Sequence, residues 1–113
     1  MKKDLYELHA QMCRVFTSSK RLEIINLLRN EELSVSELAG QLKLAQANLS
    51  QHLSILREKG IVKTRRMGTT IYYSLTNPKI IKAFDIIREM LLERFAQVER
   101  ISKSMRKGYA ARE

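Results

Sequence analysis

The spacing of apolar residues changes near Gly60, and this change constrains the fold more than any other feature of the chain. Leucines recur at helical spacing over residues 46–59, whereas apolar and polar residues alternate over 61–66 and 70–75, as they do in β-strands. Gly60 stands where a left-handed helix cap favours glycine, and Gly68 stands between the two alternating segments. The sequence therefore predicts a helix followed directly by a β-hairpin.

Two shorter helices are predicted before this unit. The serines at 18–19 can cap the first of them. Ser34 and Glu37 have the spacing of a capping box, in which each side chain bonds to the backbone N–H group of the other residue. A short helix is therefore expected to run to about Gln41, separated from the next helix by residues 42–44 only. Two helices joined by a short turn and followed by a hairpin describe a winged helix-turn-helix.

Amphipathic helices are predicted on both sides of this core. The first covers residues 4–16, and the second covers 78–107 after Asn77 and Pro78, because proline is well tolerated at the first helical position. The tail from about residue 108 is expected to fray. Along the second helix an apolar side chain recurs every seven residues, at Phe84, Leu91, Val98 and Met105.

The predicted fold class is mainly α with a small β-hairpin wing. It forms one domain over residues 1–113, with a DNA-binding core at 18–76 between the helices 4–16 and 78–107. In a lone chain the apolar stripe of the last helix would lie exposed. Two copies can bury it by helix-on-helix packing, so a homodimer is predicted. The interface residues expected on this helix are Phe84, Ile87, Leu91 and Val98.

The composition narrows the possible partners. The chain of 113 residues has a formal net charge of +9, which favours nucleic acid or an anionic membrane face, although charge can also serve solubility alone. The one cysteine excludes a disulfide within the chain. There is no apolar run long enough to span a membrane, and the N-terminus lacks an apolar signal segment. A cytoplasmic protein without a membrane partner or cofactor is expected.

The helix at 46–59 has an unusual outer face. Opposite the leucines it carries small or uncharged polar side chains: Ala47, Ser50, Gln51 and Ser54. Amides and hydroxyls can bond to base edges in the major groove, so this face is predicted to read DNA. Gln46 and Asn48 flank it at the end that usually reads bases in this motif. An ordinary polar surface is the alternative interpretation.

Positive charge gathers directly after this face. Residues 57–66 include five basic residues and one acid. Phosphate contacts position a protein on DNA, whereas base contacts specify the sequence that it binds. The predicted partner is therefore double-stranded DNA, and the predicted phosphate-contacting residues are Arg57, Lys63, Arg65, Arg66 and Thr69.

The segment ELSVSELAGQLKLAQANLSQHLSILREKGIVKTRRMGTTIYYSL resembles the ArsR/SmtB family of winged helix-turn-helix repressors. The part NLSQHLSILREKGIV is the most specific, with its serine, histidine and leucines followed by a basic residue and a glycine. The resemblance implies a homodimer paired through the first and last helices, which adds Leu5 and Leu8 to the interface. It also implies repression relieved by an inducer, and base reading by Gln46, Ala47, Ser50 and Gln51. Ala45 departs from the pattern, because serine or threonine is the usual cap there.

Many members of this family sense metals, but the ligands of two of its sites are missing here. Ser34 and Ser36 stand where thiolates would be, in ELSVSEL against a stretch like ELCVCDL, and serine binds soft metals poorly. The last helix offers the acids Asp85, Glu89, Glu93 and Glu99 but no histidine. These acids are expected to form ion pairs with neighbouring arginines. No metal site is therefore predicted.

His9 and Cys13 are the remaining candidates for a sensor, because they lie four residues apart on one side of the first helix. Two such pairs could meet in a dimer and bind a metal, or Cys13 could respond to oxidants. The alternative for Cys13 is a small buried hydrophobe. His52 is expected to pack or to contact phosphate rather than to bind a metal.

These features favour a DNA-binding regulator. It is expected to be a repressor that binds a near-palindromic operator, and its inducer is unknown. One alternative is a winged helix that binds another protein, against which the lack of apolar anchors on the outer face argues. Another is a redox-responsive regulator that acts through Cys13. An enzyme is not expected, because no nucleophile, base and orienting partner occur together in a recognisable pattern.

Overall fold

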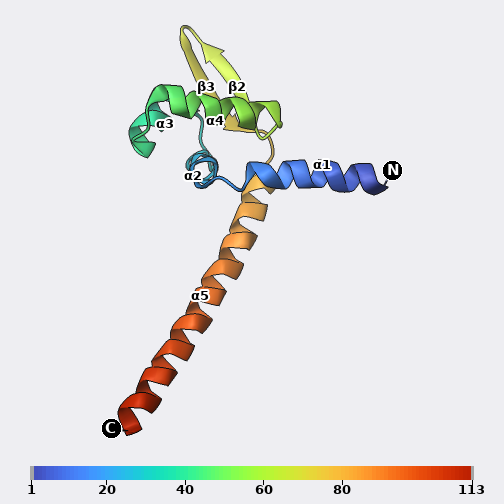
Figure 1. Cartoon of the computed structure of the whole chain (residues 1–113). Helices are drawn as coiled ribbons and strands as arrows, with labels where there is room; N and C mark the ends of the chain where they lie inside the picture. The colour runs from blue at the N-terminus through green and yellow to red at the C-terminus, as the bar shows by residue number, and fades with distance from the viewer. Residues whose placement is uncertain (1, 113) are drawn as a thin grey trace. The chain divides into compact units, whose positions relative to one another are not determined.

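The computed structural model describes the backbone of residues 2–112 and the side chains of residues 4–107. Within this part, five helices and three strands follow one another along the chain (Figure 1). Met1–Ile81 form one compact unit and Lys82–Glu113 form a second. None of the helices of residues 2–112 combines the length and the apolar character that crossing a membrane requires.

The first unit is built around the helices α2 (Ser19–Leu27), α3 (Val35–Leu42) and α4 (Gln46–Glu58). Their apolar faces meet in a core, and burying each such side chain contributes about 1.5–3 kcal/mol relative to leaving it in water. The largest fully buried side chains are Ile24, Ile25, Leu28, Leu38, Leu49, Leu53, Leu56 and Ile61. Helical spacing in the sequence predicted the leucines of α4 as part of this core, and the structure confirms them.

Side-chain caps fix where these helices begin. The Ser18 hydroxyl accepts a hydrogen bond from the Arg21 backbone N–H at 3.3 Å, so Ser18 is the cap of α2. The predicted capping box is present, since the Ser34 hydroxyl accepts from the Glu37 N–H and Glu37 Oε1 accepts from the Ser34 N–H, both at 3.1 Å. Helix α3 ends at Lys43 in a left-handed conformation, with φ 54°.

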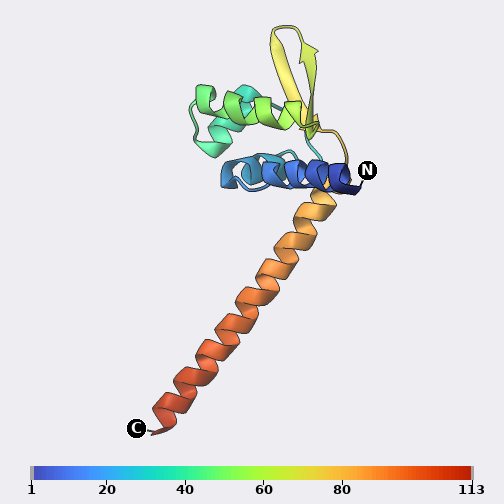
Figure 2. The same ribbon diagram turned by 45° about the vertical axis from the view of Figure 1, so that its right-hand side comes forward.

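The wing is an antiparallel hairpin of β2 (Val62–Met67) and β3 (Thr70–Leu75), paired from Val62 with Leu75 to Met67 with Thr70. Gly68 makes the turn with φ 63°, as the sequence predicted. Figure 2 shows the hairpin projecting from the end of α4, away from the bodies of α2 and α3.

The structure adds a third strand that the spacing of residues did not predict. Strand β1 (Leu33–Ser34) pairs antiparallel with β3, which gives a sheet in the order β1-β3-β2. Two residues are too few to show alternation, so no periodicity in the sequence reveals this strand. Leu33 lies opposite Tyr73 and Ser34 opposite Tyr72.

Two further helices contain the predicted dimerisation segments. Helix α1 (Lys2–Val15) buries Val15, which is 2% exposed. Helix α5 (Lys79–Arg112) is 34 residues long and starts beside Asn77, whose side-chain oxygen accepts from the Lys79 N–H at 2.9 Å. The helical backbone extends to Arg112, five residues beyond the predicted end of the helix at 107.

Candidate nucleic-acid interface

Helix α4 presents the candidate base-reading surface because its other side is anchored in the core. Leu49, Leu53 and Leu56 are each at most 1% exposed, which fixes the rotation of the helix about its axis. The opposite side is exposed and carries Ala47, Ser50 and Gln51, and the other two side chains predicted to read bases, Gln46 and Asn48, are exposed beside it at the N-terminal end. This surface presents amides and a hydroxyl with no charged group, so it can offer both donors and acceptors to base edges.

The N-terminal end of α4 lacks a side-chain cap. Ala45 is the N-cap residue in extended conformation and makes no side-chain hydrogen bond to the helix. The sequence predicted this departure, since an alanine cannot accept a hydrogen bond from the first turn. The first backbone N–H groups of α4 therefore point outward without a side-chain acceptor, at the end of the helix where the macrodipole favours an anion.

The cations predicted to contact phosphate all lie on the surface. Arg57 is in the last turn of α4, while Lys63, Arg65 and Arg66 follow one another along β2 toward the tip, where Thr69 is also exposed. Successive residues of a strand point to opposite faces of the sheet. Arg65 and Arg66 therefore cannot act in the same way, although the sequence alone gave them the same role.

Arg65 has a partner that the sequence analysis missed. Its guanidinium donates to both carboxylate oxygens of Glu32, at 2.8 to 3.1 Å, and lies 5.3 Å from the centre of the Tyr72 ring. The hydrogen bond from Arg65 holds the pKa of Glu32 below its ordinary value, and the same bond raises the pKa of Arg65. Glu32 is 33 residues away in the sequence, so only the pairing of β1 with the hairpin brings these two side chains together.

Arg66 lies differently from Arg65. Its Nε donates to the backbone carbonyl of Gly68 at 3.2 Å, and no carboxylate among residues 4–107 pairs with it. The full charge of Arg66 thus stands beside the hairpin tip, available to an external anion.

His52 is half-buried on α4 beside the core leucines. Its Nδ1 atom is buried and has no hydrogen-bond partner within the described part of the chain. This placement agrees with the expectation that His52 packs, and it leaves a polar atom inside without a protein partner.

The candidate sensor residues both lie exposed on α1. The interpretation of Cys13 as a buried hydrophobe is wrong for the single chain, because its thiol is on the surface, one helical turn from His9. Over residues 4–107, no three His, Cys, Asp or Glu side chains come close enough together to hold a metal ion.

The residues predicted to form the dimer interface fall into two groups. Leu5, Leu8, Ile87, Leu91 and Val98 are 52–67% exposed, which leaves their apolar area free for a partner. Phe84 is 6% exposed in the single chain, and the Arg88 guanidinium lies 4.5 Å from the centre of its ring. Phe84 therefore has little area left to bury against a second copy.

Comparison with known proteins agrees with this geometry. The family model described as "Bacterial regulatory protein, arsR family" matches residues 18–64, which include the whole of α2, α3 and α4. The transcriptional activator HlyU of Vibrio cholerae is 34% identical over 79 residues, which are 70% of this chain and 73% of HlyU. The transcriptional regulator Rv0081 of Mycobacterium tuberculosis is 32% identical over 108 residues, or 95% of each chain.

Solved structures share the fold. The crystal structure of Rv0081 matches with a TM-score of 0.77 and 33% identity, over 82% of this chain and 94% of the other. The homodimeric winged helix-turn-helix DNA-binding domain of Mb0332 from Mycobacterium bovis matches with a TM-score of 0.75 and 26% identity, over 81% and 85% of the two chains. The winged helix-turn-helix named for Mb0332 is also the architecture observed here.

The two wing arginines are predicted to contribute unequally to the binding of duplex DNA. Replacing Arg66 by Gln should weaken binding to random DNA and reduce the slope of log K against log salt by about 0.9, the value for one lost phosphate contact. Replacing Arg65 by Gln should do less, because Glu32 already neutralises this guanidinium. Fluorescence anisotropy over a series of salt concentrations measures both effects.

Glu32→Gln is the matched control for this prediction. It removes a negative charge and releases Arg65, so it should strengthen binding to random DNA and steepen the salt slope. If Arg65→Gln instead reduces the slope as much as Arg66→Gln, and Glu32→Gln has no effect, the pair with Glu32 does not restrain Arg65.

Proposed function

The chain belongs to the ArsR family of bacterial regulatory proteins and is a DNA-binding transcriptional regulator, and from this we propose that it acts as a homodimer on a near-palindromic operator. The exposed face of α4 from each subunit enters the major groove, and the wing contacts the flanking phosphates. The observation that carries this proposal is the side of α4 opposite Leu49, Leu53 and Leu56, which over residues 47–54 is exposed, uncharged and rich in hydrogen-bonding groups.

The side chains of α4 can discriminate bases by their chemistry. A glutamine or asparagine amide can bond in pairs to the N6 and N7 atoms of adenine, and serine can donate to or accept from either kind of base. We assign this reading to Gln46, Ala47, Asn48, Ser50 and Gln51, the exposed residues of the first turns of the helix. A protein-binding surface would instead need apolar anchors, and none of these five residues has a large apolar side chain.

Phosphate contacts come from both ends of this surface. The free backbone N–H groups after Ala45 suit a phosphate oxygen at the start of α4. Arg57, Lys63, Arg66 and Thr69 supply contacts at the other end and along the wing, with Arg65 contributing less while it is bound to Glu32. Such contacts fix the register of α4 in the groove and give most of the affinity that salt can screen.

Pairing of two subunits sets the distance between the two copies of α4. We place the interface on the exposed apolar side chains of α1 and α5, namely Leu5, Leu8, Ile87, Leu91 and Val98. A two-fold axis then requires half-sites about 10 base pairs apart or a multiple of that, which is the geometry of a near-palindrome. Bound over a promoter in the cytoplasm, such a dimer acts as a repressor until an inducer releases it.

If these side chains read bases, replacing them should reduce the affinity for DNA by an amount that depends on the DNA sequence. Replacing Gln51 or Ser50 by Ala should cost about 1–3 kcal/mol on the cognate operator and far less on random DNA, because only base contacts are removed. Gln41→Ala removes a similar exposed amide from α3 and is the matched control. Competition gel shifts against random DNA measure the difference, and equal losses on both DNAs would contradict the assignment.

The interface predicts that charge on the stripe of α5 will separate the subunits. Leu91→Asp together with Val98→Asp should give monomers at micromolar concentration and abolish tight operator binding, because each change buries a carboxylate in an apolar contact. Ala96→Asp places the same charge on the opposite side of the helix and should leave the dimer intact. Sedimentation velocity measures the masses; a wild-type monomer at this concentration would contradict the interface.

This regulator is not controlled through the two metal sites described above for the family, the thiolate site at positions 34 and 36 and the site on the last helix. Ser34 and Ser36 supply no thiolate, and Ser34 is already occupied as the cap of α3. Titrating Zn²⁺, Cd²⁺ and As(III) into the protein–DNA complex should therefore cause no release that survives Cys13→Ser. Release by a mild oxidant that Cys13→Ser abolishes would identify the exposed Cys13 thiol as the sensor; micromolar release by a metal in that variant would sink the proposal.

A further inference from the structure

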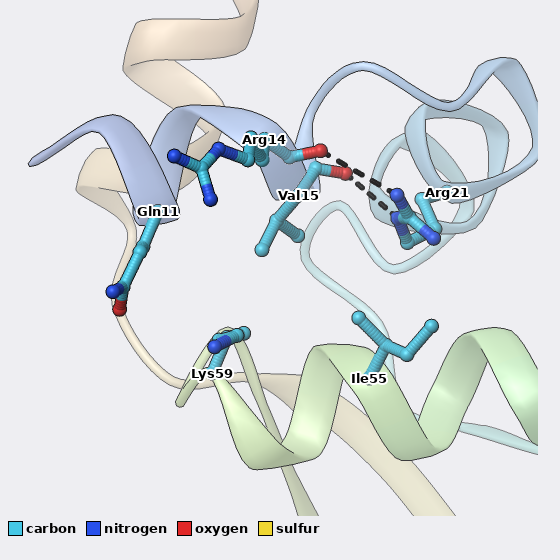
Figure 3. A pocket seen from close by; sticks show the side chains of 6 residues that line it. All are labelled: Gln11, Arg14, Val15, Arg21, Ile55 and Lys59. Atoms are coloured by element: carbon cyan, nitrogen blue, oxygen red, sulfur yellow. Dashed lines mark hydrogen bonds between the residues drawn. The ribbon is translucent and has the colours of Figure 1, made fainter. Parts of the chain in front are cut away.

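A small cavity lies where α1, α2 and α4 meet (Figure 3). Its volume is about 110 Å³, enough for a small molecule or several waters. Val15 of α1 and Ile55 of α4 point toward the space between these helices and give it an apolar floor. The remaining lining side chains are polar or charged: Gln11, Arg14, Arg21 and Lys59.

Three of these side chains are cations, and no carboxylate lines the cavity. Arg21 is held in place, because its Nε donates to the Val15 carbonyl at 2.8 Å and its terminal nitrogen to the Arg14 carbonyl at 3.4 Å (Figure 3). Arg14 and Lys59 use their side chains for no ion pair with any carboxylate among residues 4–107. A concave surface lined by charge of one sign focuses its field and attracts a counter-ion.

We propose that this cavity binds a small oxyanion, a phosphate or carboxylate group carried by a compact molecule. The guanidinium of Arg14 offers paired donors that match the oxygens of such a group, and Lys59 offers a point charge from the other side. Val15 and Ile55 supply apolar area for a short carbon skeleton. The volume of the cavity suits a small group, and the cationic lining without a carboxylate disfavours a cation.

None of the candidate DNA-reading side chains lines the cavity, but part of its lining comes from the same helix, α4. Ile55 lies one helical turn after Gln51 on α4, and Lys59 is the C-cap residue of the same helix. Gln11 and Arg14 belong to α1, which carries part of the proposed dimer interface. An anion that bridges Arg14 and Lys59 would therefore join the two helices on which DNA reading and pairing depend. The group bound is a free anion and not a phosphate of the DNA backbone.

The test is a titration of the full-length protein with inorganic phosphate, followed by ¹⁵N NMR, without DNA and at constant ionic strength maintained with chloride. Saturable shifts are expected at Arg14, Arg21, Ile55 and Lys59. The variant Arg14→Gln with Lys59→Gln should weaken phosphate binding roughly tenfold or more, because it removes two charge-assisted contacts. The variant Lys63→Gln with Arg66→Gln loses the same charge from the wing and should leave the phosphate-induced shifts at Arg21 and Ile55 in the cavity as they are in the wild type.

Two outcomes would overturn the inference. One is a set of shifts that rise linearly without saturation, or that are equal in the Arg14 and Lys59 double variant and the wild type. The other is a fall in the salt slope for random DNA in that double variant as large as in the wing double variant, which would assign these cations to the DNA backbone. Phosphate binding is measured without DNA, so its failure is distinct from a failure of the proposed DNA-binding function.

Discussion

The position of the wing depends on hydrogen bonds that residues 32–34 make both to helix α3 and to the strands of the hairpin. The Ser34 side chain caps α3, and its backbone pairs with β3 opposite Tyr72, so one residue joins the helix-turn-helix to the hairpin. Ser34 is 7% exposed, where an unpaired hydroxyl or N–H group would cost about 1–3 kcal/mol. Two residues earlier, Glu32 binds Arg65 on β2. A hairpin alone is marginally stable in water, and these attachments give it a defined position beside α4.

The same contacts divide the work among the cations of the wing. An exposed ion pair such as Glu32 with Arg65 contributes little to stability, about 0–1 kcal/mol, but it occupies the donors that a phosphate would need. The ion pair of Arg65 with Glu32 orients the hairpin. The guanidinium of Arg66 has no carboxylate partner among residues 4–107 and is therefore free to contact DNA. On α4 the division runs along the helix, because Arg57 in the last turn carries a charge, whereas the exposed side chains over residues 46–54 are uncharged. A helix that carried lysines there would bind any DNA tightly and read none of it well.

Local signals in the sequence predicted most of the fold. The capping box at Ser34, the helix period of α4 and the glycine at 68 each act over a few residues, and each is present in the structure. Strand β1 and the pair of Glu32 with Arg65 were missed because they depend on contacts between segments about 30–40 residues apart. The cavity was missed for the same reason, since its lining comes from three helices. The helix period in the sequence predicts that the base-reading residues are exposed, but it does not predict which bases they contact.

Helix α5 cannot owe its length to its own sequence preference alone. Isolated helices gain little from propensity in water, and amphipathic ones are stabilised mainly by packing of the apolar face. Along this 34-residue helix Ile87, Leu91 and Val98 are more than half exposed, so most of the packing that would stabilise it is absent from a single chain. In the proposed dimer a second subunit supplies that packing and at the same time presents a second α4. Linking two reading helices makes the second contact with DNA intramolecular, which raises affinity far beyond that of one subunit. The proposed interface thus makes the stability of α5 and tight binding to an operator depend on the same event, the pairing of two chains.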